Sequence, residues 1–99
     1  MNPAVERVSD AALKALDLNL MRHQVAAKNI ARANEPGFLA HRVSISDQAG
    51  TAESQPGTLP VRLDHEVAEM VSASLEYQLI ADALSRYLGM SRLAISTRS

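Results

Sequence analysis

The strongest constraint on the fold is a long amino-terminal stretch without helix breakers. No glycine or proline occurs between Val5 and Ala33, and Pro3 follows Asn2 as expected for a helix N-cap with proline in the first turn. The stretch ends at Asn34-Glu35-Pro36-Gly37, where proline disfavours a helical preceding residue and Pro-Gly suits the central positions of a type II turn. The sequence therefore predicts a helix over about residues 3–33, followed by a change of chain direction.

The middle of the chain, about residues 34–63, has the composition of a connecting arm. It holds three of the four glycines and three of the four prolines. Partial alternation of apolar and polar residues over 39–45 predicts at most one short strand. Residues 49–60 carry few large apolar side chains to offset the entropy of ordering, so we expect a flexible segment there.

The carboxy-terminal third predicts a second long helix. Asp64 is a candidate N-cap, Glu66 falls in the first turn, and the sequence stays rich in apolar residues as far as Ile95. A helix over about 64–96 would be roughly 45 Å long. Because 99 residues allow one domain, we expect a single all-α domain over residues 1–99. Its two terminal helices would form an antiparallel coiled-coil hairpin, joined by a mostly irregular arm.

Each predicted helix carries apolar residues on more than one face. The side chains predicted to form the coiled-coil seam are Leu13, Leu16 and Leu20 of the first helix and Met70, Tyr77, Leu84 and Leu88 of the second. Further apolar residues lie away from this seam, namely Leu18, Met21 and Val25 on the first helix and Leu75, Leu79, Met90 and Leu93 on the second. Pairing of the two helices buries only one stripe of each, and contiguous exposed apolar surface usually marks an interface. We expect polymeric assembly; the alternative is a compact bundle whose flanks are covered by the arm or by a homodimer partner.

No residue pattern for catalysis, cofactor binding or metal binding occurs in the sequence. The absence of cysteine excludes disulfides, thiolate zinc sites and cysteine nucleophiles. His23, His41 and His65 lack ligand spacing, and the glycines form no phosphate-binding loop. We therefore expect a protein that is not an enzyme and that holds neither cofactor nor metal.

Charge and hydropathy weigh against nucleic acid and membrane as direct partners. Ten lysines and arginines face eleven aspartates and glutamates, so no strong field attracts a phosphate backbone. No stretch reaches the roughly 18 apolar residues needed to cross a bilayer. The charged residues spread over the first 20 positions are unlike a cleavable secretory signal.

The segment from Gln24 to Phe38 carries the sharpest motif in the sequence. Asn29 places an amide within the helix shortly before the Pro-Gly turn, and a buried amide is costly unless it is hydrogen bonded. Asn29 is therefore expected to tie the end of the helix to a neighbour or to the turn; the alternative is an asparagine that faces solvent.

This segment resembles the amino-terminal signature of the bacterial flagellar basal-body rod proteins, approximately L-A-x-N-I-A-N-A-x-T-P-G-[YF]. The matching residues are Asn29, Ile30, Ala31, Ala33, Pro36, Gly37 and Phe38. Arg32 and Glu35 depart from the signature, which usually has Asn and Thr at these positions. The carboxy-terminal run with Ser74-Leu75, Tyr77-Gln78, Leu84-Ser85 and Ala94-Ile95 looks like the final helix of the same family and is closest to the proximal-rod subunit.

The resemblance implies a structural subunit of the proximal rod, the hollow drive shaft that transmits torque and conducts exported subunits. Its partners would be copies of itself, other rod subunits, the protein that joins the rod to the MS ring, and the flagellar type III export apparatus. The chain would be made in the cytoplasm, exported without a cleavable signal peptide, and assembled in the periplasm. Asn29, Pro36, Gly37 and Phe38 would then form the turn and subunit contacts.

Two other classes of function compete with this interpretation. A soluble helical-hairpin adaptor or regulator of flagellar export would form a discrete dimer rather than a polymer. A small helix-turn-helix DNA-binding protein is suggested only by the alanine-rich helix and turn. Near-neutral charge and the lack of a basic recognition helix argue against the DNA-binding interpretation.

Overall fold

The computed structural model describes residues 2–45 and 52–97 and contains two helices and two strands. In chain order these are α1 (Pro3–Ala31), β1 (Leu39–Ile45), β2 (Ala52–Pro60) and α2 (Leu63–Thr97). Part of the predicted flexible segment, residues 49–51, lies outside the described residues.

Helix α1 begins and ends with the local chemistry expected from its sequence. The side-chain Oδ1 of Asn2 accepts a hydrogen bond of 2.9 Å from the Ala4 N–H, which confirms the N-cap. After the helix ends, the Phe38 N–H donates to the Glu35 carbonyl at 3.2 Å, and Gly37 has a φ of +78°. This hydrogen bond and positive φ are those of the predicted type II turn, in which glycine avoids the strain of the left-handed conformation.

The prediction of an all-α fold is wrong, because the arm contains a two-stranded antiparallel sheet. Strands β1 and β2 pair from Ile45 with Ala52 through His41 with Pro56, and the register shifts between Leu39 and His41. Residues 52–60, predicted to be flexible, form strand β2 of this hairpin. Most β2 side chains face solvent, so the strand needs few large apolar residues.

Proline and glycine in the middle of β2 are accommodated at the irregular part of the sheet. Pro56 lies opposite His41, next to the register shift, and a strand with an open edge tolerates a residue that lacks an N–H. A Cβ at Gly57 would lie 2.3 Å from the Ala40 carbonyl oxygen, so only glycine lets the two backbones approach this closely. Residues that suggest a loop in the sequence therefore shape a bulged hairpin.

Helix α2 begins one residue earlier than predicted. The Glu66 N–H donates to the Arg62 carbonyl at 3.0 Å, and the helix starts at Leu63. Asp64 is therefore inside the first turn and not the N-cap, which corrects the sequence-based prediction. Its carboxylate still lies at the positive end of the helix dipole, where negative charge is favourable.

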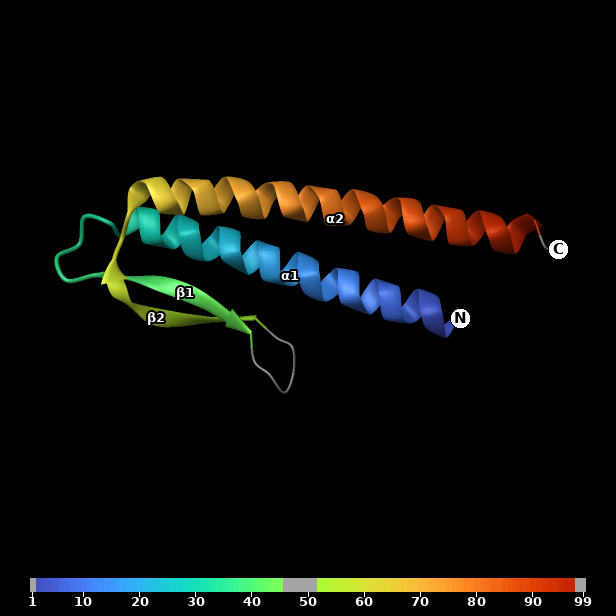
Figure 1. Cartoon of the computed structure of the whole chain (residues 1–99), viewed down its shortest axis with the longest axis horizontal. Coiled ribbons are helices and arrows are strands. Elements are labelled where there is room, and N and C mark those ends of the chain that lie inside the picture. The colour runs from blue at the N-terminus through green and yellow to red at the C-terminus, as the bar shows by residue number, and fades with distance from the viewer. Residues whose placement is uncertain (1, 46–51, 98–99) are drawn as a thin grey trace.

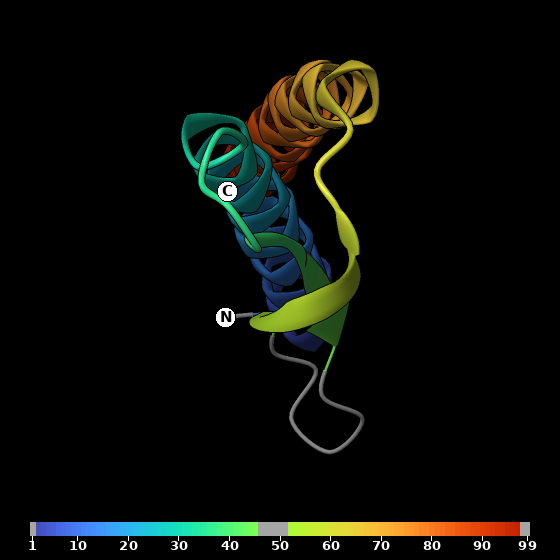
Figure 2. The same ribbon diagram turned by 90° about the vertical axis from the view of Figure 1, so that its left-hand side faces the viewer.

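The elements form three layers with α1 in the middle (Figures 1 and 2). Helices α1 and α2 run antiparallel, and the β1–β2 hairpin packs against α1 and faces the start of α2 across a cavity. Helix α2 extends past the start of α1, and the molecule measures 64 × 27 × 13 Å. The molecule is thus not a pure helical hairpin but a helix pair with a small sheet beside it.

The core of the described chain is small and partly polar. Its buried apolar residues are Val25, Ala26 and Ala73, while Asn19, Asn29 and Glu66 are also buried. Alanines at the helix contact let the two backbones approach closely, and the buried amides bond to backbone or to neighbouring side chains. The polar members of this core determine how the elements are joined.

Candidate functional site

Asn29 joins α1 to the hairpin through both atoms of its amide. Its Nδ2 donates to the His41 carbonyl at 3.0 Å, and its Oδ1 accepts from the His41 N–H at 2.9 Å. The residue is only 1% exposed. Asn29 is therefore bonded to a neighbouring element as expected, and that element is strand β1 rather than the turn.

A short cluster stiffens the turn that follows α1. The Phe38 ring stacks on the His41 ring with 5.7 Å between centroids, and the Arg32 guanidinium carbon lies 4.5 Å from the centre of the Phe38 ring. Arg32 donates two hydrogen bonds, of 3.0 and 2.9 Å, to one carboxylate oxygen of Glu35. These hydrogen bonds hold the pKa of the Glu35 carboxyl below its ordinary value. The two residues that depart from the rod-protein signature thus form an ion pair across the turn.

The motif residues Asn29, Pro36, Gly37 and Phe38 therefore lie together where α1 leads into the hairpin. Pro36 and Gly37 are exposed, while Phe38 is half-buried. The structure thus presents the Pro-Gly tip outward, on a base held by Asn29 and the aromatic stack.

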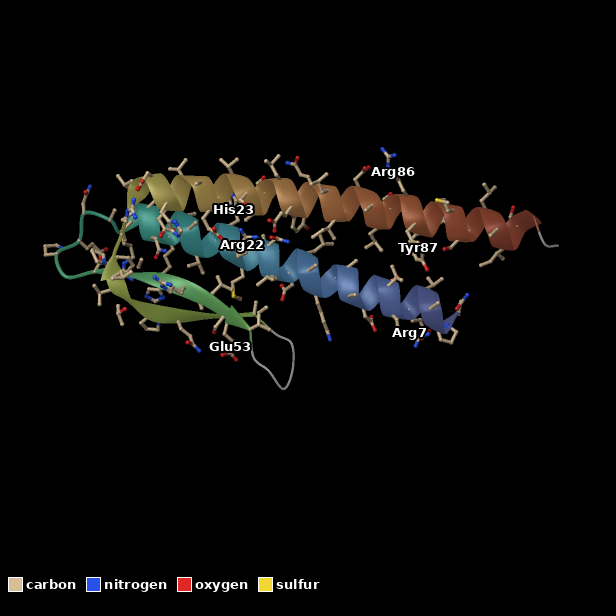
Figure 3. The ribbon with its side chains drawn as sticks, viewed as in Figure 1. Arg7, Arg22, His23, Glu53, Arg86 and Tyr87 are labelled. Carbon is tan, nitrogen blue, oxygen red and sulfur yellow. The ribbon has the colours of Figure 1, made fainter. Side chains whose placement is uncertain are left out.

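The centre of the helix pair is occupied by Arg22, which sequence reasoning did not single out (Figure 3). Its Nε donates to Glu69 and its Nη1 to Glu76, both at 2.6 Å. Nη1 also donates to the Asn19 Oδ1 at 2.7 Å, and the Asn19 amide donates in turn to the Ala15 carbonyl at 2.9 Å. The hydrogen bond with Glu69 is the largest cause that raises the Arg22 pKa above its ordinary value. Glu69 and Glu76 are seven residues apart and lie on one face of α2, a spacing that suggests a basic partner. Only the packing of α2 against α1 shows that this partner is Arg22.

The predicted coiled-coil residues are unevenly placed within a single chain. Leu16, Met70 and Leu84 are half-buried. Leu13, Leu20, Tyr77 and Leu88 are exposed, by 56%, 45%, 39% and 36% respectively. The close intrachain contact of the helices instead includes Ala26 and Ala73, with the Arg22 ion pairs beside them. Leu13 and Leu20 lie on a different flank of α1, and the described part of the chain leaves them exposed.

Helix α2 carries a second apolar face that nothing in the described chain covers. Its residues are Val71, Leu75, Leu79, Met90 and Leu93, each between 54% and 71% exposed. Their helical spacing places them opposite Ala73 and Leu84, on the side away from α1. We call this surface the outer face. A polar stretch with Asp82 and Arg86 divides it, and the Arg86 side chain points away from α1 while Tyr87 points towards it (Figure 3).

A cavity of about 640 Å³ lies between the start of α2, the end of α1 and the hairpin. Its apolar walls include Leu18, Val25 and Leu59, and its polar lining includes Arg42 and Glu66. Glu66 is 6% exposed, and its carboxylate forms no hydrogen bond or ion pair with the residues that the structure describes. Glu66 is thus a buried charged residue that the fold leaves unpaired.

Within residues 2–45 and 52–97, no group of three or more histidine, aspartate or glutamate side chains is arranged to hold a metal ion. In the same residues, neither helix is long and apolar enough to span a membrane. No protein-family model matches the chain, and a search of curated proteins gives no match. The site is therefore defined by its geometry: two helices with exposed apolar faces, a stiff turn, and a partly open cavity.

Proposed function

We propose that this chain is a structural subunit of the bacterial flagellar basal-body rod, of the proximal-rod type. In this role it polymerises with copies of itself and with other rod subunits, and it performs no catalysis. The observation that carries the proposal is the apolar surface that a single chain leaves uncovered on both helices.

The amount of uncovered surface supports an assembly. The chain exposes 7216 Å², whereas a compact monomer of this mass is expected to expose about 5,500 Å². The difference is about twice the roughly 800 Å² that each partner buries in a standard protein interface. The outer face of α2 and exposed Leu13 and Leu20 of α1 point in different directions, so one twofold partner does not cover both. Contacts between different surfaces of identical subunits generate open filaments.

The motif at the end of α1 supports the rod family in particular. Pro36, Gly37 and Phe38 form the turn, Asn29 bonds the strand that follows it, and the Pro-Gly tip is exposed for contact with a neighbour. The Arg32–Glu35 pair supplies a hydrogen-bonded connection at two positions where the signature has other residues. Residence in the periplasmic rod, a junction with the MS ring and type III export follow from the same resemblance.

The direct experiment is detection of the chain in detergent-purified basal bodies from the bacterium that encodes it. We expect the protein in wild-type rods and its loss in a strain without the flagellar export gate. A soluble cytoplasmic dimer that is absent from rods would instead support the adaptor of flagellar export.

Substitution of Leu84 tests the assembly in cells. Leu84→Asp places a charge on the face that α2 shares with buried Ala73, so we expect loss of rods and of swimming in soft agar. Ser85→Asp is the matched control, because it adds the same charge at an exposed position one residue later. Normal motility of the Leu84→Asp strain would contradict the proposed packing of this face.

A further inference from the structure

The cavity beside the start of α2 contains an unused charge. Glu66 lines it, although the residue is more than nine-tenths buried. Among the described side chains, no fully buried polar atom lacks a partner, so the unpaired carboxylate opens into the cavity. An unpaired carboxylate beside apolar walls is stabilised by a cationic donor.

Neighbouring arginines do not supply this donor. Arg22 is held by Glu69 and Glu76, and Arg62 pairs with Asp64 at 3.1 Å. Arg42 lies on the hairpin side of the cavity and forms no ion pair with Glu66. Leu18, Val25 and Leu59 line the same space, so a cation on an aliphatic stem would match both its carboxylate and its apolar wall. An arginine or lysine side chain has this chemistry.

The distribution of charge along α2 indicates where the cation comes from. Residues 62–76 contain four acids and one base, whereas residues 77–97 contain two bases and one acid. Asp82 and Arg86 pair with each other at 3.0 Å. Arg92 is left exposed, with no ion pair to a described residue. The acidic end of α2 borders the cavity, and the opposite end carries an uncompensated arginine.

Arg92 and Glu66 of one chain cannot meet. They lie 26 residues apart on the same helix, a separation of about 39 Å. Leu88 and Ile95 share a face with Arg92 and are 36% and 70% exposed. Gly89, on the adjoining surface, has open space where a side chain would be, which allows a close approach of α2 to another surface. The carboxy-terminal end of α2 thus offers a cation flanked by apolar groups, which complements the unpaired Glu66 carboxylate and the apolar part of the cavity wall.

We propose that the cavity at Glu66 receives Arg92 of a second copy of this chain. The end of α2 of one subunit docks beside the start of α2 of the next, with Leu88 and Ile95 against the apolar cavity wall. This head-to-tail contact joins two different surfaces and repeats along a filament. The inference rests on the self-association in the proposed function and specifies one of its contacts.

A double-mutant cycle on the purified full-length chain tests the pair. Glu66→Gln and Arg92→Gln each keep the side-chain shape or reach and remove one charge. We expect each to raise about tenfold the concentration at which half of the protein is assembled, measured by sedimentation velocity. The double variant should be no weaker than either single variant, because both remove the same contact. Arg7→Gln removes an arginine at the start of α1 and should leave assembly unchanged.

Unchanged assembly in either single variant would refute the contact between Glu66 and Arg92. A half-assembly concentration raised about a hundredfold in the double variant would also refute it, because independent effects multiply. Helix content measured by circular dichroism confirms that each variant is folded.

Cross-linking gives a second test, because the chain contains no natural cysteine. His65→Cys at the cavity and Gly89→Cys near Arg92 should form a reducible ladder of multimers under mild oxidation. Lys14→Cys combined with Gly89→Cys is the control pair and should form no ladder. Absence of the ladder with the first pair would overturn the docking.

The outcomes also separate this contact from the proposed function. If the chain is present in rods but the double-mutant cycle shows no coupling and no ladder forms, the docking is refuted and the proposed function is not. A ladder and coupling in a protein that is absent from rods would support the docking and refute the rod assignment.

Discussion

The amide of Asn29 should be the single most important polar side chain for attachment of the hairpin. Replacement by alanine removes both hydrogen bonds to His41 and leaves its N–H and carbonyl without partners. An unsatisfied buried group costs about 1–3 kcal/mol, and water reaches the half-buried His41 in part. We therefore expect Asn29→Ala to lower the free energy of unfolding by about 2 kcal/mol.

Urea unfolding followed by circular dichroism measures this change. Gln24→Ala is the matched control, because it removes an exposed amide from the same helix and should change stability by less than about 0.5 kcal/mol. If Asn29→Ala is as stable as this control, the bidentate link does not hold the hairpin and the reasoning is refuted.

The pH dependence of Asn29→Asp tests the geometry of the link more closely. A protonated carboxyl can donate to the His41 carbonyl and accept from its N–H, as the amide does, whereas the ionised form repels the carbonyl oxygen. The pKa of the introduced carboxyl should therefore be raised in the folded state. Its contribution is fully present below the unfolded pKa of about 3.9 and is lost as pH rises through the folded value. The stability gap between this variant and wild type should be smaller at low pH than at neutral pH.

Three further predictions concern the hairpin, helix α2 and the turn. Gly57→Ala should destabilise the protein by about 1–3 kcal/mol, because its Cβ meets the Ala40 carbonyl oxygen at 2.3 Å. Gly89→Ala, in open space on α2, should stabilise it by about 0.5–1 kcal/mol, and thermal unfolding compares the two. Glu35 has a lowered pKa beside Arg32, so its contribution is present above its unfolded pKa and is lost as pH falls through the folded value. Wild type should therefore lose stability relative to Glu35→Gln on acidification below about pH 4, and an equal slope in both would contradict the ion pair.

The two helices and the turn between α1 and β1 were predictable because their signals are local. Asn2 caps the residue two positions later, and Gly37 takes a positive φ next to Pro36. Helical periodicity likewise identified Leu75, Leu79, Met90 and Leu93 as lying away from the helix contact, where the structure leaves them exposed. Each of these features depends on residues within one or two turns of each other.

The hairpin and the contact between the helices depended on tertiary structure. Residues 52–60 have the composition of a loop, but they form a strand because β1 offers a pairing partner. Gly57 lets the backbones of the two strands approach closely at Ala40. Leucine spacing also did not reveal which flank of α1 meets α2, because small Ala26 and the Arg22 ion pairs occupy that contact.

The sequence by itself therefore determined the helices, the capping of the first, the type II turn and the surplus of apolar faces. Only the tertiary structure decided that Asn29 bonds strand β1 and that Arg22 joins acids 47 and 54 residues away. It also placed Glu66 at the cavity, where its carboxylate has no partner among the described residues. The physical reason is the separation along the sequence of the residues that interact. Capping and periodicity act between near neighbours along the chain, whereas pairing, burial and charge compensation depend on segments that only folding brings together.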